Sequence, residues 1–320
     1  MKNLNPVPQQ INRLPMQMIL EVTRSCNQAC PFCSCPWFAP DSGEILPEIE
    51  IEEFCRMAME FIAHGVRYIS ISGGEPTLKI GVEKLIVRAA DALRNCYGAA
   101  SHLAFFSNCK NMTPELLTLL AENHVELYTS LPGLGRFALQ TGEASADFHR
   151  VLKYINQARL QNIKVSVGVT IDRETLDELF EILSYAILSG ANQVILNLFK
   201  PSGRGLIKKN LALTSQESEY VAQIADEVAS LCGAVCVFGG EFPLDVAATS
   251  HPNLVVENHC QACKRSLVVG PDGWLRSCEH DPARLLPWRQ WRDLPQLERY
   301  RQFMERENLG VCPLLNGFEL

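Results

Sequence analysis

Three cysteines within eight residues have the spacing of iron ligands. Cys26, Cys30 and Cys33 lie in the run CNQACPFC, which follows an apolar segment. Each thiolate can bind one iron of a [4Fe–4S] cluster, which leaves the fourth iron without a protein ligand and open to chemistry. We therefore expect these residues to be metal ligands and the catalytic centre. A zinc site is the alternative, although zinc favours four ligands and paired Cys-x2-Cys motifs.

A second motif, Gly73-Gly74-Glu75, follows the apolar run at 67–72. Glycines allow the backbone to approach a ligand closely. A carboxylate such as that of Glu75 accepts charge-assisted hydrogen bonds from an ammonium group. The same three letters recur at 239–241, but only the first set follows a predicted strand at a suitable distance from the cysteines. We interpret the second set as a loop.

Together, these two motifs resemble the radical S-adenosylmethionine (radical SAM) family, and the resemblance covers about residues 15–205. It implies that the open iron binds SAM and cleaves it to methionine and a 5′-deoxyadenosyl radical. That radical abstracts hydrogen from a substrate, as in an oxidoreductase. The electron comes from an external donor such as flavodoxin or ferredoxin.

The resemblance also implies roles for other side chains around SAM. Phe32 occupies the position of an aromatic residue that packs near the adenine, and Gly73 and Gly74 approach the methionyl end. Ser107 and Ser130 lie in segments similar to the family's Thr-Asn-Gly and Ser-Leu-Asp-Gly, where they face SAM or substrate. Cys109 replaces the glycine of the first segment. Ordinary turn hydroxyls are the alternative for both serines.

The C-terminal region contains a second cysteine set. Cys260, Cys263 and Cys278 lie in CQACKRSLVVGPDGWLRSC, and the turn signature Pro-Asp-Gly at 271–273 predicts a hairpin from 263 to 278. The spacing resembles SPASM and twitch domains, which implies an auxiliary [4Fe–4S] cluster. We expect Cys312 to be its fourth ligand. A zinc ribbon is one alternative; a cluster with one open iron, as in the radical cyclase of molybdenum-cofactor biosynthesis, is another.

Alternating strands and helices must position these residues. Apolar runs predict strands at 17–23, 67–72, 102–107, 125–131, 164–171 and 193–200, and amphipathic helices include 54–62 and 176–187. Repeated β–α units favour an α/β fold with a parallel sheet, here a partial (β/α)6 TIM-like barrel. Ligands bind at the carboxyl ends of such strands. We divide the chain into a tail (1–14), the core barrel (15–205), a connecting region (206–255) and a small cysteine-rich twitch/SPASM-like domain (256–320).

Composition excludes several classes of function. The net charge of −7 argues against nucleic acid as the main partner. We find no apolar stretch long enough for a membrane span and no signal peptide, so we expect a cytoplasmic protein without a membrane partner. Thirteen cysteines then indicate metal ligands or redox chemistry rather than disulfides. Cys35 and Cys109 are candidate hydrogen-atom donors to a product radical.

The substrate is less well determined. The region from Ser130 to Gly205, which ends Lys-Pro-Ser-Gly-Arg-Gly, is similar to radical SAM maturases of ribosomally made peptides, so we favour peptide or protein modification. A dehydrogenase, cyclase or epimerase of a small-molecule metabolite is the main alternative. A non-catalytic iron–sulfur sensor or scaffold is a third hypothesis, which the intact Gly74 and Glu75 disfavour because a sensor needs no SAM site.

Overall fold

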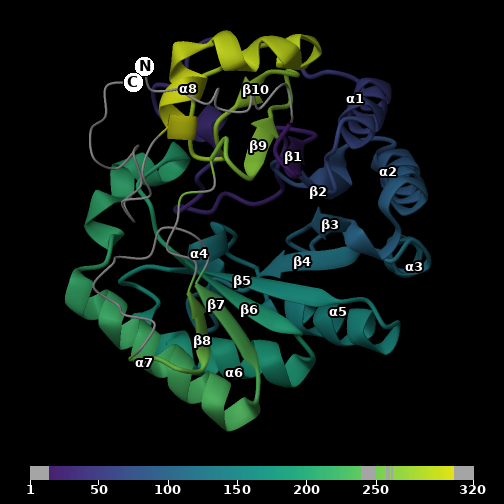
Figure 1. Cartoon of the computed structure of the whole chain (residues 1–320). Coiled ribbons are helices and arrows are strands. Elements are labelled where there is room, and N and C mark those ends of the chain that lie inside the picture. The colour runs from purple at the N-terminus through teal and green to yellow at the C-terminus, as the bar shows by residue number, and fades with distance from the viewer. Residues whose placement is uncertain (1–13, 239–249, 257–259, 261, 306–320) are drawn as a thin grey trace, which may run out of the picture.

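The computed structural model describes residues 14–238, 250–256, 260 and 262–305. Its central feature is a curved, largely parallel sheet with helices on the outside (Figure 1). The six predicted strands are confirmed to within two residues at each end: β1 (Gln17–Glu21), β2 (Tyr68–Ser72), β3 (His102–Phe106), β4 (Glu126–Ser130), β5 (Val165–Ile171) and β6 (Gln193–Leu198). The fold is thus the predicted partial TIM-like barrel.

The sheet is wider than the sequence indicated. Four short strands extend it: β7 (Val235–Phe238), β8 (Leu254–Val256), β9 (Ser266–Val269) and β10 (Leu275–Arg276). The order is β10-β9-β1-β2-β3-β4-β5-β6-β7-β8. All neighbouring pairs are parallel except β9 and β10, which form the predicted hairpin. The sheet therefore runs through all three predicted regions beyond residue 14, and the division into domains stays a prediction.

Helices flank the sheet, most of them on its outer face. They are α1 (Ile51–Ala63), α2 (Val82–Tyr97), α3 (Pro114–Glu122), α4 (Phe137–Thr141), α5 (Phe148–Leu160), α6 (Leu179–Ser189), α7 (Ser215–Cys232) and α8 (Glu298–Glu305). Short 3-10 helices include η1 (Pro36–Phe38), η5 (Gly203–Leu211) and η6 (Trp288–Gln296). Figure 1 shows α8, in yellow, near β9 and β10 and far from α6. In the described part of the chain, no helix is long and apolar enough to cross a membrane.

The core lies between the sheet and these helices. Strand β5 is almost completely buried along its seven residues, as expected for a parallel strand covered on both faces. The apolar stripe of α1, which includes Phe54, Met57 and Phe61, is buried against the sheet. Gly190 ends α6 in a left-handed conformation with φ of 112°, which accounts for a glycine there. This packing leaves the carboxyl ends of the strands free to carry polar residues.

Candidate active site

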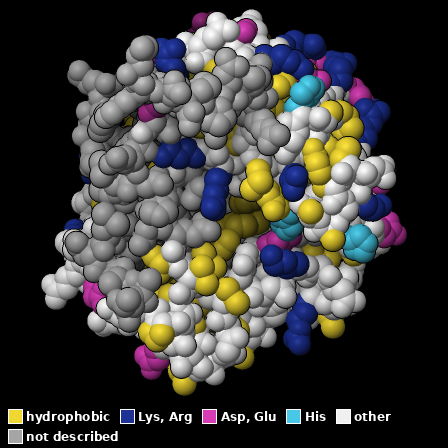
Figure 2. All heavy atoms as spheres, in the orientation of Figure 1, with side chains coloured by type: hydrophobic (Ala, Val, Ile, Leu, Met, Phe, Trp, Pro, Cys, Tyr) yellow, Lys and Arg dark blue, Asp and Glu magenta, His cyan; other side chains and the backbone are white. Residues whose placement is uncertain are grey.

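A cavity of about 360 Å³ lies at the carboxyl ends of the strands. The structure brings together there all the residues that the sequence predicts for the core site: Cys26, Cys30, Phe32, Cys33, Gly73, Gly74, Glu75, Ser107 and Ser130. They come from the loop after β1 and from the ends of β2, β3 and β4. Figure 2 shows a hollow with hydrophobic side chains at its base and Lys or Arg side chains at its rim.

Gly73 and Gly74 bring the end of β2 against the segment that leads into the cysteine loop. Gly74 N donates to Thr23 O at 2.7 Å, and Glu75 N donates to Ser25 O at 2.8 Å. A Cβ atom on Gly73 would lie 2.7 Å from Thr23 O, and one on Gly74 would lie 2.3 Å from Ser25 O. Gly73 also has φ of 147°, which other residues rarely adopt. The backbone at Gly73 and Gly74 therefore packs directly against the backbone of residues 23–25, and no side chain would fit between them.

Glu75 joins the ends of β2 and β3. Its side chain is 1% exposed, and Oε1 accepts hydrogen bonds from Ser107 Oγ at 2.9 Å and from Thr77 Oγ1 at 2.7 Å and N at 3.2 Å. Oε2 accepts from Asn108 N at 2.8 Å. Burial raises the pKa of this carboxyl, and these donors oppose the shift. The predicted contact of Glu75 with the SAM ammonium stays a prediction, because four protein donors already use its oxygens.

We expect Glu75→Gln to weaken this junction by about 1–3 kcal/mol, the cost of an unsatisfied buried polar group. An amide has one acceptor oxygen, so either orientation leaves one backbone N–H, that of Thr77 or of Asn108, facing its NH2 group. Urea unfolding will measure the loss of stability. Ser107→Ala, which removes one hydroxyl donor and keeps the carboxylate, should cost less. A Glu75→Gln variant as stable as the wild type would contradict this reading of the contacts.

The cysteine loop is also held from the side of α4. Ala29 N donates to Thr141 O at 2.9 Å, and Gly142 follows with φ of 63°. A Cβ atom on Gly142 would lie 2.5 Å from Ala29 O. From the end of β3, Lys110 Nζ donates to Asn27 O at 3.0 Å. Nothing in the sequence pointed to these contacts, since they join segments far apart in the chain.

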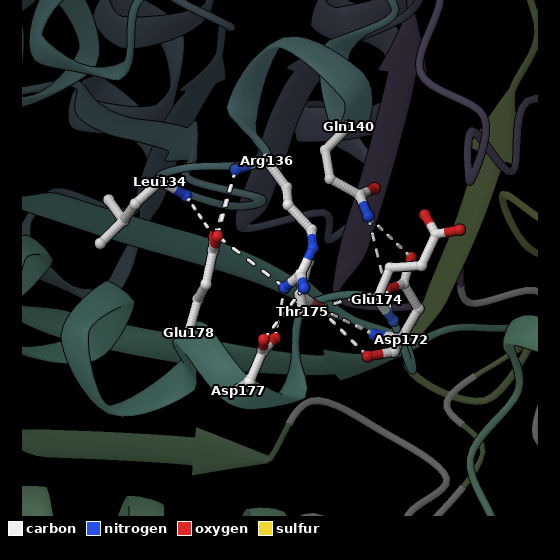
Figure 3. A network of polar contacts seen from close by, with 8 residues as sticks. All are labelled: Leu134, Arg136, Gln140, Asp172, Glu174, Thr175, Asp177 and Glu178. Atoms are coloured by element: carbon white, nitrogen blue, oxygen red, sulfur yellow. Dashed lines mark hydrogen bonds and ion pairs between the residues drawn. The ribbon is translucent and has the colours of Figure 1, made fainter.

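A polar network fixes α4 in turn to the loop after β5 (Figure 3). Glu178 accepts hydrogen bonds from Leu134 N at 2.8 Å and Arg136 N at 3.2 Å, while the Arg136 guanidinium pairs with Asp177. The amide of Gln140 donates to the buried Asp172 at 3.2 Å. The segment that supports Ala29 is therefore anchored at both ends of α4.

Three sulfurs on one loop face different surroundings. Burial and the neighbouring cysteines raise the pKa of Cys30 to about 12, and burial raises that of Cys26. The pKa of Cys33 is lowered to about 7 because the Cys35 thiol donates a hydrogen bond to it. Iron binding requires thiolates, and a bound iron itself supplies the positive charge that stabilises them. Iron ligation would therefore offset the effect of burial on Cys26 and Cys30.

Cys35 and Cys109 differ in their access to the cavity. Cys35 lines it, with Sγ 3.7 Å from Gly73 O. Cys109 is completely buried among core residues, with Sγ 3.3 Å from Thr129 Oγ1. Its φ of 60° is left-handed, a conformation that glycine, as in the Thr-Asn-Gly segment that this one resembles, adopts more readily. Cys35 therefore remains the better placed candidate for a hydrogen-atom donor.

The C-terminal segment adds cavity residues that the sequence analysis missed. Glu279 and His280 line the cavity beside Tyr128 and Lys200. Burial raises the pKa of Glu279, and Arg276 and Lys200 oppose the shift. Ser202 Oγ and His280 Nδ1 lie 2.9 Å apart. The only sequence feature that could have indicated a role for Glu279 is its position next to Cys278. That feature is informative only if the β9–β10 hairpin is known to join the barrel sheet.

The second cysteine set lies beside this segment. Cys263 is buried, and burial, together with the charges of Cys278, Asp281 and Cys260, raises its pKa. Cys312 and the second Gly-Gly-Glu at 239–241 lie outside the described residues. Within the described ranges, no three His, Cys, Asp or Glu side chains form a group suited to a single metal ion. A cluster differs in that each cysteine binds a separate iron.

Comparisons with known proteins are consistent with this geometry. The family model of the radical SAM superfamily matches residues 20–186. The mycofactocin maturase MftC of Mycolicibacterium smegmatis is 30% identical over 100% of this chain and 81% of its own length. The sporulation killing factor maturation protein SkfB of Bacillus subtilis is 28% identical over 56% of this chain, which matches only 41% of SkfB.

A solved structure shows the same fold. The structure of Streptococcus suis SuiB bound to its precursor peptide SuiA superimposes with a TM-score of 0.67 and 13% identity. The superposition covers 96% of this chain and 67% of SuiB.

Proposed function

The chain belongs to the radical SAM superfamily, and we propose that it modifies a peptide or protein substrate by abstracting a hydrogen atom. One observation supports the peptide substrate most directly. The similarity to a maturase, MftC, extends over the whole chain and not only over the barrel. The fold is also shared with SuiB, which has been solved with a precursor peptide.

The enzymes of this superfamily use a [4Fe–4S] cluster and SAM, which together supply a 5′-deoxyadenosyl radical when bound. We propose that Cys26, Cys30 and Cys33 hold the cluster in this chain. The residues fit: three thiols on one loop face a cavity of about 360 Å³, and the glycines beside them have no space for a side chain. SAM would lie in the same cavity, against Gly73 and Gly74.

The other residues bind, orient and exclude water. Phe32 and Tyr128 line the cavity with aromatic surface, which keeps water away from a reactive radical. Ser130 presents a hydroxyl to the cavity from the end of β4. Glu75 fixes Ser107 and the backbone of Asn108 in position. On the substrate side, Glu279, His280 and Lys200 offer charged and polar groups for a peptide.

Product analysis tests the substrate class. The reconstituted and reduced enzyme is incubated with SAM and a short peptide encoded next to its own gene, and the peptide is analysed by mass spectrometry. We expect a chemically modified peptide, formed together with 5′-deoxyadenosine. Formation of 5′-deoxyadenosine with an unchanged peptide would instead favour a small-molecule metabolite, and absence of SAM cleavage would favour the sensor hypothesis.

We also propose an auxiliary [4Fe–4S] cluster at Cys260, Cys263 and Cys278, with Cys312 as fourth ligand. The reconstituted protein should then contain about eight irons per chain, four for each cluster. Replacing Cys260, Cys263 and Cys278 together with alanine should reduce the iron content to about four. Iron near four with bound zinc in the unaltered protein would show a zinc ribbon instead. An unchanged second cluster in Cys312→Ala would show one open iron.

The electron for the reaction would come from an external donor such as flavodoxin or ferredoxin, and we place the reaction in the cytoplasm. The number of cysteines supports this setting, because a reducing compartment keeps thiols available as ligands.

A further inference from the structure

The segment after β6 contacts the cysteine loop directly. Gly203 has φ of 53°, and a Cβ atom there would lie 2.6 Å from both Cys33 O and Cys35 O. Arg204 N donates a hydrogen bond to Cys33 O at 2.8 Å. This part of the Pro-Ser-Gly-Arg-Gly run thus lies directly on the backbone of Cys33 and the two residues that follow it.

The Arg204 side chain reaches further along the same loop. Its Nη1 donates to Cys30 O at 2.9 Å, and its guanidinium carbon lies 4.4 Å from the centre of the Phe38 ring. Phe38 belongs to η1, which directly follows the cysteine run. Arg204 therefore contacts the loop at Cys30 and Cys33 and the following helix η1 at Phe38.

The positive charge of Arg204 lies beside the cysteine loop. In the described part of the chain, its side-chain contacts are a carbonyl and an aromatic ring, and no carboxylate pairs with it. The hydrogen bond from Nη1 to Cys30 O places this charge next to the loop that carries Cys26, Cys30 and Cys33. A cluster held by three thiolates gains negative charge when it is reduced, and a fixed positive charge nearby favours that form.

We propose that Arg204 is a positioning residue that holds the cysteine loop in its cluster-binding shape and raises the reduction potential of the core cluster. This inference rests on the proposed cluster at Cys26, Cys30 and Cys33. It adds a function for the Pro-Ser-Gly-Arg-Gly run, which the hydrogen-abstraction reaction by itself does not explain.

Redox titration of the reconstituted full-length protein without substrate tests the charge effect. In Arg204→Gln, which keeps a donor but removes the charge, the ratio of reduced to oxidised core cluster at the wild-type midpoint should fall about tenfold, or about 59 mV. Arg204→Lys should restore most of the potential. The core cluster is identified by the change in its electron paramagnetic resonance signal when SAM is added.

Arg173→Gln is the matched control. Arg173 follows β5, pairs with Glu217 at 2.9 Å and is 41% exposed, so its loss should leave the potential unchanged. Equal shifts in Arg204→Gln and Arg204→Lys would overturn the charge effect, and an unchanged potential and iron content in Arg204→Gln would overturn the whole inference. If the wild type itself binds no core cluster, the proposed function fails instead. If Arg204→Gln does not fold, Arg204→Lys still tests the proposal. Loss of the core cluster in Arg204→Lys, which keeps the positive charge, would contradict the role of charge.

Discussion

A variant with Cys26, Cys30 and Cys33 all replaced by alanine will form no 5′-deoxyadenosine above background. The three thiols are the only described cysteines that lie together with Gly73 and Glu75 on the cavity, apart from Cys35. Without three ligands the core cluster has no attachment, and the auxiliary set lies on a different segment. Anaerobic reconstitution, reduction and chromatography of the products measure the effect. Circular dichroism should show that the fold persists, since the cysteine loop contributes no strand or α-helix.

The control for this variant removes cysteines that lie elsewhere. Cys96 and Cys232 are exposed, at the ends of α2 and α7. Their replacement by alanine should leave 5′-deoxyadenosine formation and iron content unchanged. Undiminished SAM cleavage in the triple variant would overturn the assignment of the core site.

The sequence predicted the barrel well because its signals are local. Each buried parallel strand is a short apolar run, and each helix has an apolar face with a period near 3.6 residues, so both are visible within a window of a few residues. The strand ends follow from those assignments. Because carboxyl ends of parallel strands share one edge, the meeting of Cys26, Gly74, Ser107 and Ser130 was predictable as well.

The extension of the sheet at its two edges was not predicted, although the hairpin of β9 and β10 was. β8 has three residues and β10 has two, which is too short for any periodic pattern. The pairing of β9 with β1 joins Ser266 to Gln17, across almost the whole chain. Sequence patterns contain no information about such distant pairing, so Glu279 and His280 could not be placed in the cavity in advance.

The hydrogen-bond and packing partners of the site residues could not be predicted from the sequence either. Glu75 was expected to face SAM, yet its oxygens accept four hydrogen bonds from Thr77, Ser107 and Asn108. Gly73 and Gly74 were expected to approach a ligand, which stays a prediction, and the structure shows that they approach the backbone of Thr23 and Ser25. In both cases the residue type was informative about the chemistry, whereas the choice of partner depends on the three-dimensional arrangement.

Gly74→Ala should produce the second large effect. The new Cβ atom would lie 2.3 Å from Ser25 O and 2.7 Å from Arg24 O, both backbone atoms that no side-chain rotation can move away. The end of β2 must then separate from the segment before Cys26, which breaks the hydrogen bonds from Gly74 N to Thr23 O and from Glu75 N to Ser25 O. Overpacking of this kind costs about 1–3 kcal/mol.

The substitution should disturb the active site more than the hydrophobic core, because the displaced segment leads directly into the cysteine loop. We therefore expect iron content and 5′-deoxyadenosine formation to fall roughly tenfold or more, the kinetic equivalent of that energy. Gly43→Ala is the matched control: nothing lies within 4 Å of its Cβ position, so iron content and SAM cleavage should be those of the wild type. Equal activity in Gly74→Ala and Gly43→Ala would show that the contact between the end of β2 and the cysteine loop does not shape the site.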